Sequence, residues 1–196
     1  MNTHSAEPYD NISTRKMDNS HNSPAILIVE DDSEQMDLLV GYALNEIKSL
    51  IDDQASEELE IQKLKELRVL KVSNISTLEK AVIRHKNIIL TVLDCNIPDI
   101  KGGVPHDQLI KTNYKITGQH KSVDILTENI PDTPITMISS LNRFRKIVTQ
   151  HYFKTHGLNI NFIAKSDQAM INRNIGYYIR QYISNGKETS YKVLEH

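Results

Sequence analysis

Short apolar runs that end abruptly in charged or hydroxyl side chains constrain this chain most. The first run, Ala25–Val29, is rich in β-branched residues and is followed directly by Glu30, Asp31 and Asp32. A continuous apolar run of this length, bounded by charges, is typical of a strand that is buried on both faces of a parallel sheet. The sequence therefore favours an α/β architecture in which buried strands deliver polar side chains to one edge.

Four further runs repeat this pattern, and stretches with helical periodicity separate them. Strands are predicted at residues 67–72, 88–93, 135–138 and 161–164. Helices are predicted across residues 36–51, 76–85, 141–152 and 171–182. The segment Ser76–Glu79 has the pattern of a capping box that opens the second of these helices. Strands that alternate with helices indicate a parallel sheet covered on both faces, with right-handed crossovers.

Two polar stretches fit none of these elements. Residues 52–60 contain five acidic side chains and are predicted to be a solvated connection that ends the packing face of the first helix. Residues 111–130 contain Lys111, Lys115, His120 and Lys121, with Tyr114 among them. This second stretch has the composition of a basic contact surface, but a solvated loop or short hairpin is the preferred interpretation.

Length and composition favour one domain with a tail at each end. Residues 1–24 are polar and are expected to be a disordered tail, and residues 25–186 are expected to form the domain. Residues 187–196 are a C-terminal tail, and its last three residues resemble the start of an affinity tag. The 23 basic and 25 acidic side chains nearly balance, which gives no general attraction to nucleic acid or anionic lipid.

The cysteine content and the apolar runs bear on the compartment. Cys95 is the single cysteine, so an internal disulfide is excluded and a reducing compartment is favoured. The apolar runs are far shorter than the roughly 18 residues that suggest a membrane span. We therefore expect a cytoplasmic protein without a membrane partner.

The polar residues that end the predicted strands form a candidate site. In an open parallel sheet, ligands bind outside the carboxyl ends of the strands. The first strand ends in Glu30 and Asp31, the third in Asp94, the fourth in Ser139 and the fifth in Lys165. Crowded carboxylates repel each other by about 4 kcal/mol per pair at 4 Å and an effective dielectric of 20, so a cation would stabilise them.

This donor set suits phosphoryl transfer. Magnesium prefers oxygen ligands and is commonly held by one or two carboxylates together with a phosphate. Asp94 could act as a nucleophile toward phosphorus, with Lys165 neutralising a phosphoryl oxygen and Ser139 donating a hydrogen bond to another. The residues alone therefore predict a Mg²⁺-dependent phosphoryl site.

Four blocks of sequence resemble the signature blocks of bacterial two-component response regulator receivers, in the same order. These blocks are Ile26–Asp32, Leu93–Pro98, Ile135–Ser140 and Phe162–Lys165. By this resemblance, the acidic pair falls on Glu30 and Asp31, the phosphorylated aspartate on Asp94, the switch hydroxyl on Ser139 and the lysine on Lys165. The switch aromatic falls on Phe162, and the main-chain carbonyl that binds the metal falls on Asn96.

The resemblance implies a fold, a cofactor and partners. The fold is expected to be a flavodoxin-like, doubly wound, five-stranded parallel sheet of order 2-1-3-4-5. Insertions are expected after strand 1, near residues 52–66, and between strands 3 and 4, near residues 104–132. Mg²⁺ would be held by Asp31, by Asp94, by the Asn96 carbonyl and, through water, by Glu30. Ser166 departs from the family, which usually has proline after the lysine.

The resemblance implies a signalling switch rather than an enzyme. A sensor histidine kinase or a phosphotransfer protein would phosphorylate Asp94, and a downstream protein would read the changed surface without direct nucleic-acid binding. The family also uses the face of the last two strands and helices for homodimers. One alternative is a receiver-like adaptor that acts without phosphorylation. A less favoured alternative is an aspartate-nucleophile phosphatase, which would need a second aspartate where this chain has Asn96.

Overall fold

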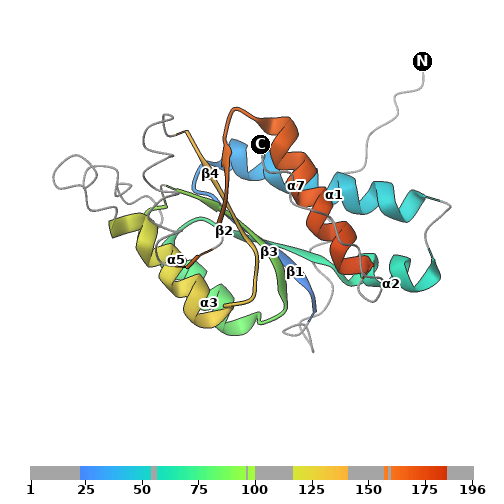
Figure 1. The fold of residues 1–196 in the computed structure, drawn as a ribbon, viewed down its shortest axis with the longest axis horizontal. Coiled ribbons are helices and arrows are strands. Elements are labelled where there is room, and N and C mark those ends of the chain that lie inside the picture. The colour runs from blue at the N-terminus through green and yellow to red at the C-terminus, as the bar shows by residue number, and fades with distance from the viewer. Residues whose placement is uncertain are drawn as a thin grey trace, which may run out of the picture.

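The described part of the chain forms an all-parallel, five-stranded sheet with helices on both faces (Figure 1). A computed structural model describes residues 23–53, 57–95, 97–99, 117–140, 157–158 and 160–184. The strands are β1 (Ala25–Val29), β2 (Arg68–Val72), β3 (Ile88–Asp94), β4 (Ile135–Ser139) and β5 (Ile160–Ala164). The helices are α1 (Ser33–Asp52), α2 (Glu58–Glu66), α3 (Ile75–Arg84), α5 (Thr117–Asn129) and α7 (Gln168–Ile183).

The strand order confirms the predicted flavodoxin-like topology. The order is β2-β1-β3-β4-β5, and every neighbouring pair is parallel. All residues of β1 and β4 are buried, whereas β2 at the edge exposes Arg68 and Lys71. Continuous apolar sequences occupy strands covered on both faces, and mixed sequence occupies the edge.

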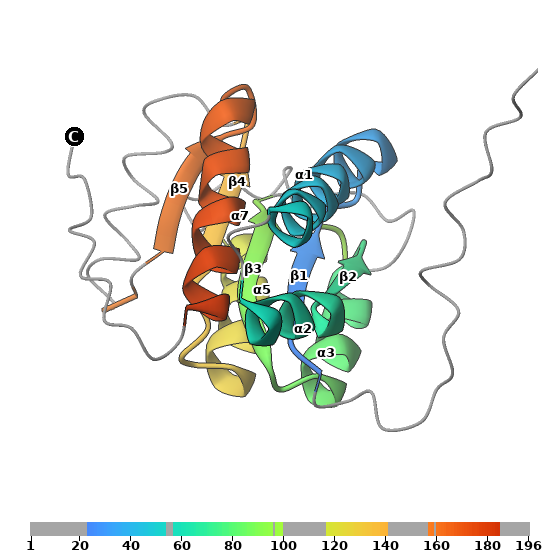
Figure 2. The same cartoon turned by 90° about the vertical axis from the view of Figure 1, so that its right-hand side faces the viewer.

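Helices α1, α2 and α7 cover one face of the sheet, and α3 and α5 cover the other (Figure 2). Each face has its own hydrophobic core. Ile26 and Ile28 of β1 pack toward α1, α2 and α7, and Leu27 and Val29 pack toward α3 and α5. This split follows from the alternation of side chains along a strand. Burying one such side chain contributes about 1.5–3 kcal/mol to the stability of the fold. The hydrophobic effect therefore holds both helical layers on the sheet.

Helices α1 and α7 were predicted from their apolar spacing, and the structure confirms them. Each begins after an aspartate whose side chain accepts a hydrogen bond from the main chain of the first turn. Asp32 accepts from the Gln35 N–H at 2.9 Å, and Asp167 accepts from the Met170 N–H at 3.0 Å. These caps satisfy backbone donors that a helix start otherwise leaves open.

Helix α3 ends where the sequence predicted but begins earlier. The capping-box interpretation of Ser76 is wrong, because the helix starts at Ile75 and Asn74 caps it. The Asn74 side chain accepts a hydrogen bond from the Thr77 N–H at 2.9 Å. An Asn side chain caps a helix as well as Ser does, so the type of residue does not distinguish the two positions.

The stretch at 52–60 is not connection throughout, because α2 begins at Glu58. Glu57 and Glu60 form the capping box of α2. The side chain of each accepts a hydrogen bond from the main-chain N–H of the other. Leu64 is 1% exposed and anchors the helix in the core shared with α1 and α7. Acidic residues that suggested solvated connection therefore begin a helix, where negative charge is favourable.

The loop or hairpin expected within 111–130 is wrong for residues 117–129, which form α5. Val123, Leu126 and Ile130 recur at three- and four-residue spacing and are buried against the side of the sheet that α3 covers. Lys121, which suggested a basic surface, pairs with Asp99 at 3.1 Å. Charged residues between these apolar positions concealed the helical period.

Several predictions fall on residues outside the described ranges. These are Asn96, the helix at 141–152, the basic residues Lys111 and Lys115, and the tails before residue 23 and after residue 184. Within the described ranges, no peptide bond is cis, in keeping with Ser166 after Lys165. None of the described helices is long and apolar enough to span a bilayer.

Candidate functional site

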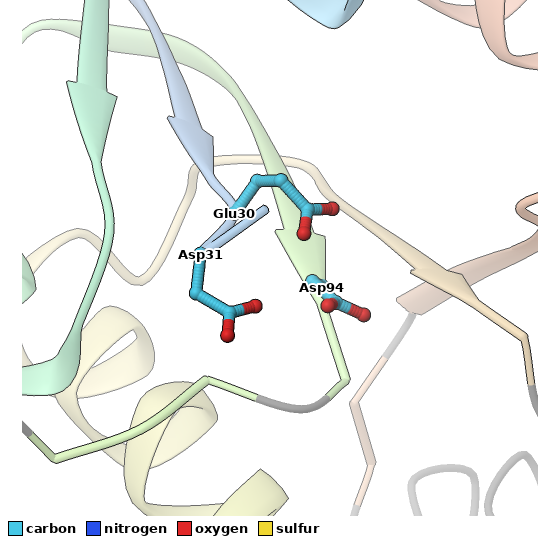
Figure 3. Close-up of side chains that lie close together, drawn as sticks. All are labelled: Glu30, Asp31 and Asp94. Atoms are coloured by element: carbon cyan, nitrogen blue, oxygen red, sulfur yellow. The ribbon is translucent and has the colours of Figure 1, made fainter. Parts of the chain in front are cut away.

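Three carboxylates converge at the carboxyl end of the sheet (Figure 3). Glu30 and Asp31 follow the last residue of β1, and Asp94 is the last residue of β3. Strands β1 and β3 pair with Val29 opposite Leu93, so Glu30 and Asp94, the next residue of each, lie side by side. Ligand oxygens of all three lie within 4.8 Å of one another. The sequence predicted this convergence.

Lys165 joins the cluster from the far side of β4. Its N–H donates to the Ser139 carbonyl at 2.9 Å, which continues the pairing of β4 and β5. Its Nζ lies 2.8 Å from Asp94 Oδ2 and 2.9 Å from Glu30 Oε2. One ammonium therefore bridges two carboxylates that come from different strands.

Burial divides the acids into two kinds. Glu30 is 1% exposed and Asp94 is 4% exposed, whereas Asp31 is open to solvent. The Lys165 side chain is partly buried between them. Buried charges are costly unless they are paired, so the Lys165 bridge is required for both buried acids to be charged together. Asp31 provides the side of the cluster that an ion or ligand from solvent can reach.

The electrostatics of the cluster raise the pKa of Glu30 to about 7. Burial is the main cause, and the negative charge of Asp94 adds to it. Lys165 and the Asp32 N–H, which donates to Glu30 at 3.2 Å, act in the opposite direction. Burial lowers the pKa of Lys165, but Asp94 and Glu30 together raise it above its ordinary value. Glu30 thus changes charge near neutral pH, while Lys165 stays protonated.

Ser139 and Phe162 lie in neighbouring strands near the cluster. Ser139 ends β4, directly after the residue that pairs with Asp94, and is 3% exposed. Phe162 pairs with Met137 and is 6% exposed in the core beneath α3 and α5. Ser139 is therefore close in register to Asp94, whereas Phe162 sits deeper along β5.

The carboxylate donors fit magnesium. All three are hard oxygen ligands. Asp94 is buried and Asp31 is exposed, so one side of the cluster is open to solvent. Magnesium keeps several water ligands, so a partly open cluster suits it better than a closed cage.

Two features of the site were missed from the sequence. The direct ion pair between Glu30 and Lys165 was not predicted, because the sequence assigned Glu30 only a role toward the metal. The main chain after Asp94 is also fixed, because the Ile75 and Ser76 N–H groups donate to the Pro98 and Asp99 carbonyls at 2.9 and 3.1 Å. The start of α3 therefore supports the loop that follows Asp94. Asn74, a strong helix-capping residue, was the available signal.

Comparison with known proteins identifies the fold. No family model matches the sequence, and no curated protein matches it either. The signal receiver domain of a protein described as a Luxo repressor from Vibrio parahaemolyticus superposes with a TM-score of 0.50 at 14% identity, covering 81% of this chain and 91% of that one. The non-phosphorylated HemR receiver domain from Leptospira biflexa gives 0.46 at 18% identity, covering 84% and 98%.

These similarities concern the fold alone, since the identities are low. The strand order and the superposition on the Vibrio parahaemolyticus domain show that the chain has the flavodoxin-like receiver fold. The acidic cluster lies at the carboxyl edge of that fold, where ligands of open parallel sheets bind. The predicted fold is thus confirmed.

Proposed function

We propose that this protein is a response regulator receiver that accepts a phosphoryl group on Asp94. The observation that carries the proposal is the contact of 2.8 Å between Lys165 Nζ and Asp94 Oδ2, beside Glu30 and Asp31. An aspartate next to a fixed ammonium group and further carboxylates can bind an anionic group together with a metal ion. The receiver fold supports the proposal, because the strands that carry these residues end at one edge of its sheet.

The transfer needs little chemistry from the protein beyond positioning. A carboxylate oxygen of Asp94 forms the new bond to phosphorus while the bond from phosphorus to the donor nitrogen of a phosphohistidine breaks. The electron pair of the broken bond stays on the imidazole of the donor. Lys165 neutralises charge on a phosphoryl oxygen, and Ser139 donates a hydrogen bond to another. Positioning and charge stabilisation account for most catalysis of phosphoryl transfer.

Asp31, Asp94 and the Asn96 carbonyl would hold Mg²⁺ directly, and Glu30 would hold it through water. The ion would offset the negative charge that otherwise keeps an anionic donor from the cluster. Glu30, whose pKa is about 7, is ionised only when the pH exceeds that value or when other charges favour it.

The proposed role is a switch between proteins, in the cytoplasm. A sensor histidine kinase or phosphotransfer protein donates the phosphoryl group, and Ser139 and Phe162 transmit the change to the surface of β4, β5 and α7. A downstream protein reads that surface, which is also the face for a homodimer. Adding a charged group to a buried site shifts the balance between two conformations, which is the physical basis of such switches. The protein acts as a phospho-acceptor rather than an enzyme with turnover on other substrates.

Mass spectrometry of the intact protein tests this proposal. After incubation with acetyl phosphate and Mg²⁺, we expect the addition of one phosphoryl group that hydroxylamine removes. Asp94→Asn should abolish the addition, and Asp124→Asn, which changes an exposed acid of α5, should leave it unchanged. Omission of Mg²⁺ should reduce it strongly.

Two other results would overturn the proposal in different ways. No addition to a folded protein, with either acetyl phosphate or a phosphorylated histidine-containing domain, would favour a receiver-like adaptor that works without phosphorylation. Repeated turnover of a chromogenic phosphate ester, lost in Asp94→Asn, would favour a phosphatase.

A further inference from the structure

A basic groove lies at the β2 edge of the sheet, away from the acidic cluster. It has a volume of about 300 Å³ and is formed between β2 and one face of α3. Leu70, Val72 and Ala81 give it an apolar floor, and Lys80 and Arg84 stand on its helical side. Both of these cations are exposed, and none of the described residues that line the groove is acidic. A chain whose formal net charge is −2 therefore concentrates positive charge here.

The strand that borders the groove has main-chain groups free for pairing on its outer side. β2 pairs only with β1 in the described sheet. The Arg68 N–H donates to the Pro24 carbonyl and the Val72 carbonyl accepts from Glu30, so alternate residues of β2 face β1. In a parallel ladder the intervening residues, Val69 and Lys71, direct their N–H and C=O groups outward. These groups are a template for another extended segment.

The spacing of the cations matches the repeat of an extended chain. Lys80 and Arg84 are one helical turn apart, which corresponds to a rise of about 6 Å. Side chains on one face of a strand recur about every 6.6 Å. An extended segment beside β2 would thus present alternate side chains at nearly the separation of these two cations. The Lys71 ammonium does not contribute, because it pairs with Asp37 at 3.2 Å.

We propose that this groove binds an extended acidic segment of a partner protein, which adds as a strand to β2 and pairs alternate carboxylates with Lys80 and Arg84. Main-chain pairing supplies affinity, and the basic side chains select for acidic residues at every second position. The apolar floor at Leu70 and Ala81 receives short aliphatic parts of the segment. This surface is separate from Asp94 and from the face of β4, β5 and α7.

Fluorescence anisotropy with a short labelled peptide tests the proposal directly. In the probe, every second residue is glutamate, and the residues between the glutamates are threonine or valine. We expect Lys80→Glu/Arg84→Glu to weaken its binding by about tenfold or more, because two exposed charge pairs become repulsive contacts. Lys48→Glu/Lys65→Glu makes the same charge change on exposed residues of α1 and α2 and should leave binding unchanged. Labelling by acetyl phosphate should be the same in both double variants.

Hydrogen exchange adds a readout that general charge attraction would not move. Bound peptide should slow exchange of the Val69 and Lys71 amides by about tenfold or more at saturation, and it should leave the Arg68 amide unaffected because that amide already pairs with Pro24. A peptide of the same composition with all glutamates contiguous should bind more weakly and give less protection.

Several results would overturn the proposal. Equal binding of the alternating and contiguous peptides, or equal binding by the Lys80→Glu/Arg84→Glu variant, would reduce the groove to a general anion surface. Competition by inorganic phosphate is a separate test. If phosphate displaced the peptide at the concentration at which phosphate itself slows amide exchange in the groove, the groove would be a small-anion site. A dimer detected by light scattering and lost in that variant would make a second copy of this chain the occupant.

Discussion

The acids at the carboxyl end of the sheet and the acids of residues 52–60 differ in burial and in the groups that they contact. Glu30 and Asp94 are buried, lie beside Asp31 and share Lys165. The acids of residues 52–60 are mostly exposed, and two of them form the capping box of α2. Convergence and burial, rather than the number of acids, therefore make a chemical site.

The largest expected difference concerns the cation shared by the buried acids. Lys165→Ala should lower the free energy of unfolding at pH 8 by about 2–3 kcal/mol, because Glu30 and Asp94 would lose their common partner while remaining buried. Urea denaturation measures this change. Lys71→Ala, which removes an exposed pair with Asp37, should cost no more than about 0.5 kcal/mol. Equal losses in the two variants would mean that burial adds nothing to the cluster.

The next effect is the dependence of stability on pH. Unfolded Glu30 loses its proton near pH 4.5, and folded Glu30 keeps it to about pH 7, so the folded state binds one more proton between these values. The free energy of unfolding should therefore fall as pH rises through this window, on the order of 2–3 kcal/mol in total. Glu30→Gln should flatten that part of the profile.

Glu58→Gln provides the matched control for the pH prediction. Glu58 is an exposed acid in the first turn of α2, so its replacement should leave the slope between pH 4.5 and 7 unchanged. Chemical denaturation at several pH values gives the profiles. A slope that survives Glu30→Gln but disappears in Glu58→Gln would reverse the assignment of the titrating group.

Magnesium should distinguish the two acidic regions. At a concentration about ten times its dissociation constant, Mg²⁺ should add about 1.4 kcal/mol to the free energy of unfolding. Asp31→Asn should abolish this gain, because the exposed ligand of the cluster is lost. Asp53→Asn, which neutralises an exposed acid of the other region, should keep it. A gain that depends on Asp53 instead would locate the ion outside the cluster.

A smaller effect is expected from Asp94 itself. Asp94→Asn should raise the free energy of unfolding of the metal-free protein at pH 8 by about 1 kcal/mol, because one of two repelling buried acids becomes neutral while Lys165 still pairs with Glu30. Thermal and urea denaturation measure the change, and Asp124→Asn on α5 is the control. A clear loss of stability would show that the ion pair between Lys165 and Asp94 outweighs the repulsion.

The sequence predicted the sheet and the cluster because both depend on local patterns. Each strand is an apolar run, and each site residue directly follows one, so knowing the strands locates Glu30, Asp94 and Lys165 at one edge. What could not be predicted depends on long-range packing. The ion pair between Lys165 and Glu30 joins residues at the ends of β5 and β1, with β4 and β3 between them, and nothing local specifies that contact.

Helices α2 and α5 were missed for a related reason. Only Leu64 of α2 is fully buried, so the helix has almost no apolar period of its own and forms because α1 and α7 provide a surface for it. In α5, Val123 and Leu126 have helical spacing, but the surrounding polar residues suggested a loop. Tertiary packing stabilises both helices more than their own sequence does.

The smallest expected effect lies at the end of α1, in the exposed acidic region. Asp52 is the last residue of this helix, and the last turn of α1 contains no basic side chain. A negative charge at a helix C-terminus opposes the helix dipole, so Asp52→Asn should raise the free energy of unfolding by about 0.5 kcal/mol. Because Asp52 is exposed, added salt should remove most of this gain, whereas the effect of Asp94→Asn at a buried position should persist. Urea denaturation at low and high salt measures both. If salt screened the two variants equally, the buried cluster would be as solvated as the connection, and the distinction between the two acidic regions would fail.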